Sequence, residues 1–192
     1  MSDVKIDEVR KADYPIDEMF LNRWSPRAFQ EKGVDEETLM TVLEAAKWAP
    51  SGANKQPWRF ILANTEEDLE IFHSFIMEGN LEWAKKAPAY VLIISDSNES
   101  VSHAFDAGTA WGGYLALQAM KSGLITHAMG GIHKDQAREL LDIPDHFDIH
   151  ALIAIGYQDD VSVLEERYQE REIPSERKPL TETVMKGKFV RA

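Results

Sequence analysis

Two basic side chains and a hydroxyl group lie close together in the segment Arg23-Trp24-Ser25-Pro26-Arg27-Ala28-Phe29. Arg23 and Arg27 are four residues apart, and Ser25 lies between them beside a proline. An arginine guanidinium offers a rigid fork of donors that suits phosphate and carboxylate groups, and a serine hydroxyl adds another donor. The segment is therefore a candidate anion-binding site, although two solvated arginines on a surface turn would give the same pattern.

A polar loop is expected in a second stretch, Ala49-Pro50-Ser51-Gly52-Ala53-Asn54-Lys55-Gln56-Pro57-Trp58. Pro50 ends the helix expected before it, because the residue before a proline avoids the α region. Gly52 and Asn54 tolerate a positive φ, and hydroxyl, amide and backbone groups make the loop rich in hydrogen-bonding atoms around the one charged residue, Lys55. Such a loop suits a planar ligand with polar edges better than a phosphate or a metal ion. A plain helix–strand connector is the alternative.

The composition limits the classes of function. The chain has 192 residues, of which 44% are hydrophobic and 28% charged, and this suits one domain with a sizeable core. A net charge of −12 argues against nucleic acids and anionic membrane surfaces as partners, so an anionic cofactor would need a local basic cluster. The chain has no cysteine, which excludes disulfides and thiolate chemistry, and its 6 histidines follow no zinc pattern, so we expect no metal.

Several common signatures do not occur. The sequence contains no G-x-G-x-x-G dinucleotide fingerprint, no G-x-x-x-x-G-K-[ST] phosphate loop and no G-x-S-x-G nucleophile elbow. The stretch Met1-Ser2-Asp3-Val4-Lys5 does not begin a signal peptide, and no apolar run reaches membrane-spanning length. We therefore expect a cytoplasmic protein that does not bind membranes.

Together, the two stretches resemble the signature of the nitroreductase family of flavin enzymes. R-x-S-x-R-x-F is followed about twenty residues later by A-P-S-x-x-N-x-Q-P-W, in the family's order and joined by an expected helix. The resemblance runs from about Ile16 to Leu180 and is less specific after the two motifs. It implies FMN as the cofactor, with NADH or NADPH as the electron donor. The scattered basic, hydroxyl, amide and glycine positions fit such a cofactor, which has an anionic end and a polar heteroaromatic end.

The resemblance also implies roles for single residues. The first stretch would hold the phosphate, the ribityl chain and the pyrimidine edge of FMN, with Trp24 contributing its backbone. The second stretch would come from the other subunit and line the isoalloxazine ring, with Asn54 bracing the loop. The expected FMN-binding residues are Arg23, Trp24, Ser25, Arg27, Pro50, Ser51, Gly52, Asn54, Asn80, Met129, Gly130, Gly131, Arg177 and Lys178.

Three positions in the middle of the chain concern the ring. Asn80 falls where the family has an asparagine facing the pyrimidine. Trp83 replaces a lysine that some members carry three residues later, which leaves Arg27 as the cation expected at the N1/C2 edge. Gly130 and Gly131 match a loop whose backbone amides approach N5 and O4, although a plain β-turn would have the same sequence.

The C-terminal segment raises a question about charge. Arg177 matches the second residue of a basic pair at the phosphate, but Ser175 stands where the first cation is often found. Lys178 is the candidate that would replace this cation. A solvated tail is the alternative for both basic residues.

Hydrophobic periodicity predicts helices and strands in turn along the chain. Helices are expected at about 15–22, 35–49, 66–77, 81–86, 103–122 and 134–141, and strands at 58–63, 89–94, 124–129 and 149–156. Residues 1–192 would form one domain, with a loose N-terminus over 1–14 and a tail over 174–192. The family resemblance implies an α+β, nitroreductase-like three-layer fold, in which helices flank a central mixed, mainly antiparallel sheet.

A homodimer with shared active sites is expected. The 103–122 helix is apolar on more than one face, and its glycines permit another helix to approach closely. The tail carries apolar residues but no fold of its own, so it would embrace the partner subunit as a domain-swapped segment. If the loop after Pro50 reaches the partner's flavin, the active site exists only in the dimer, with an interface above ~2,000 Å².

The predicted function is reduction of nitroaromatics, quinones or related conjugated small molecules by NAD(P)H, through ping-pong hydride transfer at flavin N5. The flavin carries the chemistry, so no catalytic side chain is expected. The stretch from Ile94 to His103 is too short for a substrate-covering insertion, which predicts an open site and loose specificity. Three alternatives remain: reductive dehalogenation or flavin fragmentation within the family, a non-catalytic FMN-binding protein, and a helical interaction module without a cofactor.

Overall fold

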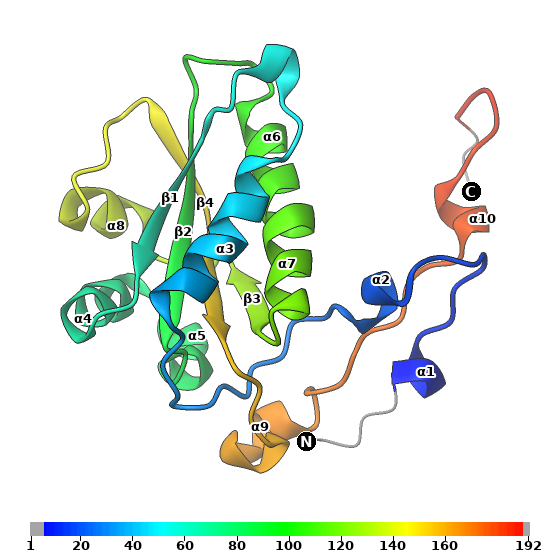
Figure 1. The fold of residues 1–192 in the computed structure, drawn as a ribbon, viewed down its shortest axis with the longest axis horizontal. Coiled ribbons are helices and arrows are strands. Elements are labelled where there is room, and N and C mark those ends of the chain that lie inside the picture. The colour runs from blue at the N-terminus through cyan, green and yellow to red at the C-terminus, as the bar shows by residue number, and fades with distance from the viewer. Residues whose placement is uncertain (1–5, 190–192) are drawn as a thin grey trace.

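The computed structural model describes residues 6–189, and a four-stranded sheet forms its centre. The strand order is β1-β2-β4-β3. The strands are β1 (Trp58–Ala63), β2 (Ala89–Asp96), β3 (Ile125–Met129) and β4 (Phe147–Gly156). All three pairings are antiparallel (Figure 1). The mainly antiparallel sheet is thus confirmed, and among the described strands no parallel pairing makes it mixed.

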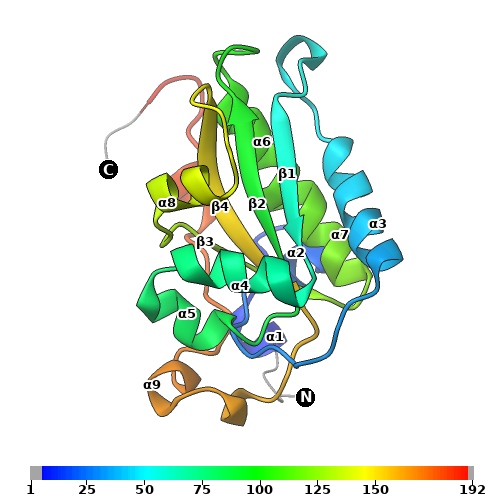
Figure 2. The same cartoon turned by 90° about the vertical axis from the view of Figure 1, so that its left-hand side faces the viewer.

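Helices cover both faces of this sheet, as Figures 1 and 2 show. One face carries α3 (Glu36–Lys47), α6 (His103–Thr109) and α7 (Ala116–Lys121), and the other carries α4 (Glu66–Phe75), α5 (Glu78–Ala84) and α8 (Lys134–Leu140). Each face has its own apolar core. The expected three-layer α+β arrangement is therefore confirmed.

The side chains of β2 show why the sheet needs helices on both faces. Tyr90, Leu92 and Ile94 belong to one core, while Val91 and Ile93 belong to the other, as the two-residue period of a strand requires. An antiparallel strand buried on both faces reads as a continuous apolar run rather than as an alternating one. Both β2 and β4 extend two residues beyond the apolar runs, because they pair with each other as far as Asp96 and Phe147.

One expected helix boundary is wrong. The stretch from Glu78 to Asn80 reads as a helix breaker, but α5 begins at Glu78 and ends at Ala84. The backbone N–H groups of Asn80 and Leu81 both donate to the carbonyl of Met77, which starts the helix. Gly79 lies in the first turn, and the buried Trp83 outweighs the modest cost of a glycine there.

The long apolar helix forms, but it contains an irregular centre. The π-helical segment η2 (Ala110–Leu115) joins α6 to α7. Two adjacent glycines, Gly112 and Gly113, lie in this segment, and glycine weakens a regular helix locally. A Cβ atom on either glycine would meet nothing within 4 Å among the described residues, so packing within this chain does not require glycine at these two positions.

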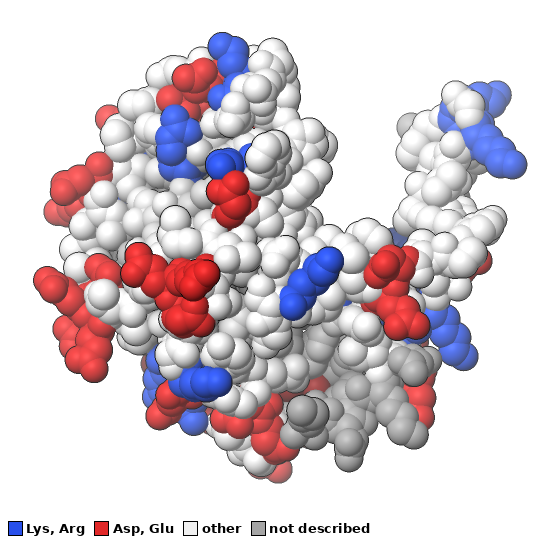
Figure 3. Space-filling view, viewed as in Figure 1, with Lys and Arg blue, Asp and Glu red and all other residues white. Residues whose placement is uncertain are grey.

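The two ends of the chain form an arm that projects from the body (Figures 1 and 3). We define the arm as residues 6–22 and 174–189; it contains α1 (Ile6–Val9), α2 (Glu18–Asn22) and α10 (Leu180–Thr183). The N-terminal and C-terminal segments of the arm are joined by a hydrogen bond from the N–H of Leu180 to the carboxylate of Asp13, at 2.8 Å. The segment expected to be a loose N-terminus contains α1 and the hydrogen-bonded Arg10, while residues 1–5 lie outside the described part. Within residues 6–189, no helix combines the length and the apolarity needed to cross a membrane.

Three short elements complete the described chain. A single turn, η1 (Gly52–Asn54), follows α3, and another, η3 (Val161–Val163), precedes α9 (Glu166–Gln169). The carbonyl of Gly79 accepts a hydrogen bond from the Tyr168 hydroxyl at 2.8 Å, which ties α9 to α5. The backbone N–H groups of Arg27 and Ala28 donate to the carboxylate of Glu172, which places the chain before Pro174 beside the segment that follows α2.

Candidate functional site

Five arginine side chains line one pocket of about 310 Å³, which we call the arginine pocket. Its lining is Arg10, Arg23, Trp24, Ser25, Arg27, His127, Arg171, Ile173, Ser175 and Arg177. The surface elsewhere is rich in acidic groups: α4 begins with Glu66, Glu67 and Asp68, and acidic side chains cover that region in Figure 3. The pocket is therefore a local basic cluster in a chain of net charge −12, as an anionic ligand would require.

The start of the first motif lies on the floor of this pocket. Arg23 ends α2 in an extended conformation, and its Nη1 donates to the carbonyl of Trp24 at 3.1 Å and to the hydroxyl of Ser25 at 3.4 Å. Burial and, second, the charge of Arg177 lower the pKa of Arg23 from its usual value. Arginine still stays protonated at neutral pH, so its charge is available to an anion.

Arg10 is a part of the pocket that the sequence did not reveal. It is only 7% exposed, and its Nε donates to the carbonyl of Ser175 at 2.9 Å. Its Nη1 donates to the carbonyls of Leu21 and Arg23 at 2.7 and 2.8 Å. Burial and, second, the neighbouring Arg177 lower its pKa. Arg10 thus joins three segments of the pocket that lie far apart in the chain.

His127 lines the pocket as a neutral acceptor rather than as a further cation. Its Nδ1 lies 2.9 Å from the carbonyl oxygen of Pro26, which can only accept, so Nδ1 carries the proton. Burial lowers the pKa of His127 to about 4, although the hydrogen bond to Pro26 by itself raises it. The ring packs on Trp83 with their centroids 4.4 Å apart.

Two of the residues expected at the ring, Asn80 and Gly131, are in contact. The amide Nδ2 of Asn80 donates to the carbonyl of Gly131 at 3.1 Å, which joins α5 to the turn after β3. A Cβ atom on Gly131 would lie 2.4 Å from that same Nδ2, so any larger residue there would displace the amide of Asn80. Gly130 is exposed, whereas Met129 is buried in the core and could offer a ligand only its backbone.

Trp83 connects the two halves of this site. It is 4% exposed, so it is a core residue rather than a side chain at the edge of a ligand. The guanidinium carbon of Arg27 lies 6.0 Å from the centre of its ring. Trp83 thus contacts two residues of the arginine pocket, Arg27 and His127, from the same helix that carries Asn80.

The loop after Pro50 has a strained backbone. Ala53, Asn54 and Gln56 have φ angles of 48, 55 and 50°, in the left-handed region that non-glycine residues rarely adopt. The hydroxyl of Ser51 accepts a hydrogen bond from the N–H of Gln56 at 3.0 Å. Strain of this kind persists only where the surroundings enforce it, and it is common at functional sites.

A buried carboxylate holds the other side of this loop. The N–H of Gly52 donates to Oδ2 of Asp106 at 3.2 Å, and the hydroxyl of Ser102 donates to the same oxygen at 3.0 Å. Asp106 is only 3% exposed. Asn54 was expected to brace the loop, but among the described residues its side chain makes no hydrogen bond, and only its backbone takes part.

The structure does not bring the loop after Pro50 to the arginine pocket of the same chain. The loop lies at the end of the sheet where α6 begins, and the pocket lies at the opposite end, beside α2 (Figures 1 and 2). The residues of the first motif, Asn80 and Gly131 are thus gathered in one region. Pro50, Ser51, Gly52 and Asn54 are not.

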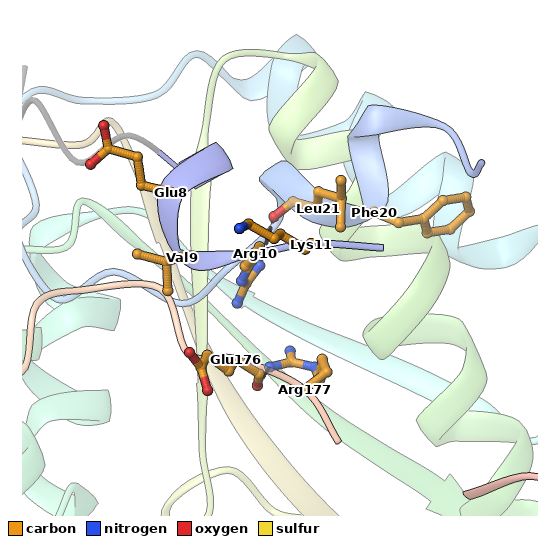
Figure 4. Close-up of a pocket in the computed structure, with 8 residues that line it drawn as sticks. All are labelled: Glu8, Val9, Arg10, Lys11, Phe20, Leu21, Glu176 and Arg177. Atoms are coloured by element: carbon orange, nitrogen blue, oxygen red, sulfur yellow. Dashed lines mark hydrogen bonds between the residues drawn. The ribbon is translucent and has the colours of Figure 1, made fainter. Parts of the chain in front are cut away.

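Lys178 also lies outside the arginine pocket. It lines a neighbouring hollow on the arm with Tyr14 and Leu180. A further hollow of about 290 Å³ lies beside Arg10 and Arg177 and includes Glu8 and Glu176, whose carboxylates make it less suited to an anion (Figure 4). The arginine pocket itself is lined by two cations that were not expected there, Arg10 and Arg171, while Lys178 is not among its lining residues.

Known proteins with a similar sequence or structure were compared with this chain. The model of the nitroreductase family matches residues 21–78, a range that contains both motifs. A crystal structure described as an oxidoreductase containing FMN is 46% identical, covers 94% of this chain and 96% of its own, and superposes with a TM-score of 0.91. The chain belongs to the nitroreductase family.

Other similar proteins are more distant. A protein named NADH dehydrogenase from Thermus thermophilus is 27% identical, with 82% of this chain and 91% of that protein covered. A nitroreductase family protein from Clostridium difficile 630 is 24% identical and shares the fold, with a TM-score of 0.75 over 92% of this chain and all of its own. The fold expected from the two motifs is thus confirmed over nearly the whole chain.

The sequence did not point to three residues in or behind the arginine pocket. Arg10 lies in a stretch that looked unstructured, and Arg171 and Glu172 lie in a charged stretch without apolar periodicity. Glu172 is 2% exposed, which is unusual for a glutamate. Neither Arg10 nor Glu172 carries a local signal, because each forms a hydrogen bond with a residue more than a hundred positions away in the chain.

Proposed function

We propose that this protein is an FMN-dependent oxidoreductase that takes electrons from NADH or NADPH and reduces nitroaromatics, quinones or related conjugated small molecules. The observation that carries the proposal is the arginine pocket built on the first motif, whose Arg27 and His127 contact Trp83 on the helix that carries Asn80. A relative 46% identical is an oxidoreductase containing FMN, which supports the choice of cofactor.

The donor set of the site fits FMN. A phosphate would be held by Arg23, Ser25 and Arg177, with Arg171 at the same pocket, because arginine forks and hydroxyls are suited to phosphate oxygens. Arg27 would face the pyrimidine edge, and Asn80 with the turn at Gly131 would offer amide groups to the ring. Lys178 is not needed in this arrangement. When bound, FMN supplies hydride chemistry at N5, accepting from NADH or NADPH and donating to an acceptor in alternate half-reactions.

The protein acts as a homodimer in this proposal. The loop after Pro50 lies at the opposite end of the sheet from the arginine pocket, so it would cover the ring held by a second copy. The exposed apolar residues of the arm, including Val184 and Phe189, would pack on that copy, with residues 174–192 embracing it. The connection between β2 and α6, residues 97–102, is too short for a substrate-covering insertion, which favours an open pocket and loose specificity.

The first test is spectroscopic. The purified protein, stripped of flavin and reconstituted with FMN, should show flavin absorbance bands that bleach on addition of NADH or NADPH under anaerobic conditions. The bands should return when a nitroaromatic or a quinone is added. A reconstituted protein whose bands do not respond to either nicotinamide would be a non-catalytic binder, and a protein that takes up no FMN would contradict the proposal altogether.

Mixed dimers test whether the site is shared. One copy would carry Arg23→Ala, and the other would carry substitutions in the loop at Pro50 and Ser51. If the loop acts on the partner's site, the mixed dimer contains one intact site and regains about half of the wild-type activity. If each site uses its own loop, every site in the mixed dimer is damaged and no activity returns.

A further inference from the structure

A buried carboxylate lies directly behind the arginine pocket. Glu172 is 2% exposed, and its Oε1 accepts the backbone N–H groups of Arg27 and Ala28 at 2.5 and 3.0 Å. These two bonds span 145 and 144 residues of sequence, so Glu172 joins the chain before Pro174 to the end of the first motif. The carboxylate therefore fixes where the backbone of Arg27 lies.

The second oxygen of the same carboxylate acts on the side chain. Oε2 of Glu172 lies 3.4 Å from Nη1 of Arg27, with the side chains 1% and 20% exposed. The Trp83 ring lies at 6.0 Å from the guanidinium carbon of Arg27. Held by an ion pair and against an aromatic ring, the guanidinium has little freedom to move, and its orientation is set before any ligand arrives.

This ion pair distinguishes Arg27 from the other cations of the pocket. Among residues 6–189, no carboxylate forms an ion pair with Arg10, Arg23, Arg171 or Arg177. Charge interactions are weakly screened where water is largely excluded. A ligand near Arg27 thus meets a cation whose charge is partly neutralised, while a ligand among the other four meets full charges.

We propose that Glu172 is a positioning residue that sets the reduction potential of the bound cofactor by partly neutralising Arg27. This inference rests on the proposed function, in which Arg27 faces the pyrimidine edge of FMN. A hydride brings two electrons and one proton, so the reduced cofactor carries one more negative charge than the oxidised one. A cation at its edge stabilises the reduced form, and the carboxylate behind that cation weakens the effect.

The variant Glu172→Gln tests the proposal because it removes the charge while keeping the shape. The amide oxygen of glutamine still accepts the N–H groups of Arg27 and Ala28. We expect the FMN-loaded variant to favour reduced over oxidised FMN about tenfold more than the wild type does, which is a shift of ~30 mV to a more positive midpoint potential for a two-electron couple. The potential is measured by equilibration with a reference dye.

A matched control is available two residues away. Glu170→Gln removes the same formal charge from an exposed position, and its potential should equal that of the wild type. If Glu172→Gln binds FMN with wild-type affinity but has the potential of Glu170→Gln, or a more negative one, the inference is overturned. Failure of the wild type to bind FMN would instead refute the proposed function.

A second variant keeps the test decisive if Glu172→Gln does not fold. Arg27→Gln removes the cation itself and leaves Glu172 in place. Its potential should be more negative than that of the wild type by at least as much as Glu172→Gln is expected to be more positive. An Arg27→Gln protein that binds FMN with an unchanged potential would show that the pair does not act on the cofactor.

Discussion

The arginine pocket and the loop after Pro50 are built in opposite ways. The pocket gathers side chains from four distant parts of the chain, and long-range contacts of Arg10 and Glu172 hold it together. The loop is one continuous stretch in which the N–H groups of Asn54 and Lys55 donate to carbonyls three residues earlier. Asp106 is its long-range support.

The two regions also store unfavourable energy in different forms. In the pocket, like charges lie close together, and this lowers the pKa values of Arg10 and Arg23 in addition to the effect of burial. In the loop, the cost lies in three left-handed residues. A bound anion relieves the repulsion between the arginines, whereas the backbone strain of the loop remains whether or not a ligand is present. The pocket should therefore govern cofactor affinity, and the loop should govern how substrates meet the cofactor.

The largest effect is expected for Arg23→Ala in the pocket. Loss of a charge-assisted contact to phosphate should weaken FMN binding about 100-fold, or ~3 kcal/mol. Quenching of FMN fluorescence during titration of the stripped protein measures the affinity. Lys121→Ala, which removes an equal charge from the last turn of α7, should leave it unchanged. Equal losses in the two variants would mean that net charge, rather than the pocket, holds the cofactor.

The next effect concerns stability and pH. In the unfolded chain, His127 has the usual histidine pKa of about 6.5, whereas burial lowers its pKa in the folded protein to about 4. The unfolded state then binds more protons, so this contribution to stability is complete above pH 6.5 and falls as the pH drops toward 4. For the wild type without FMN, about 2 kcal/mol should be lost between pH 7 and 5 through this group.

Urea unfolding of His127→Gln checks this expectation. The variant should show a pH dependence that is flatter by that amount over the same range. His133→Gln, at an exposed position after β3, should keep the wild-type dependence. If His127→Gln and His133→Gln have the same dependence, the pocket does not hold a neutral histidine.

A smaller effect is expected for Arg10→Lys. Lysine keeps the charge but cannot donate in fixed directions to the carbonyls of Leu21, Arg23 and Ser175 at once. FMN affinity should fall about tenfold, because the segments that carry the cations are no longer held together. Lys11→Ala, at the next and exposed position, is the control. An Arg10→Lys protein with wild-type affinity would mean that the positive charge of Arg10 matters and its geometry does not.

The smallest effect is expected for Asp106→Asn at the loop. The N–H of Gly52 would keep an acceptor but lose the charge of the carboxylate. kcat/KM for the electron acceptor should fall about threefold, with the Kd of FMN unchanged. Asp135→Asn in the first turn of α8 should change neither. A fall in FMN affinity as large as that of Arg10→Lys would remove the distinction between the two regions.

Much of the fold could be predicted because its signals are local. The run Tyr90-Val91-Leu92-Ile93-Ile94 predicts a buried strand, and Asp35 before an amphipathic stretch predicts the start of a helix, where its carboxylate indeed accepts the N–H of Thr38. The start of α5 was missed because tertiary packing of Trp83 overrides the weak preference of Gly79. Trp83 itself could not be placed, because a tryptophan suits a core and a ligand site equally well.

By itself, the sequence determined the two motifs, the order of the elements and the strain-tolerant residues of the loop, since these depend on neighbours a few positions apart. Only the tertiary structure decided that Arg10, Arg171 and Glu172 belong with Arg23 and Arg27, and that Lys178 does not. The physical reason is that a charged side chain carries no local sign of its partner. Whether it is solvated, paired or buried depends on which distant backbone groups the fold brings within hydrogen-bonding distance.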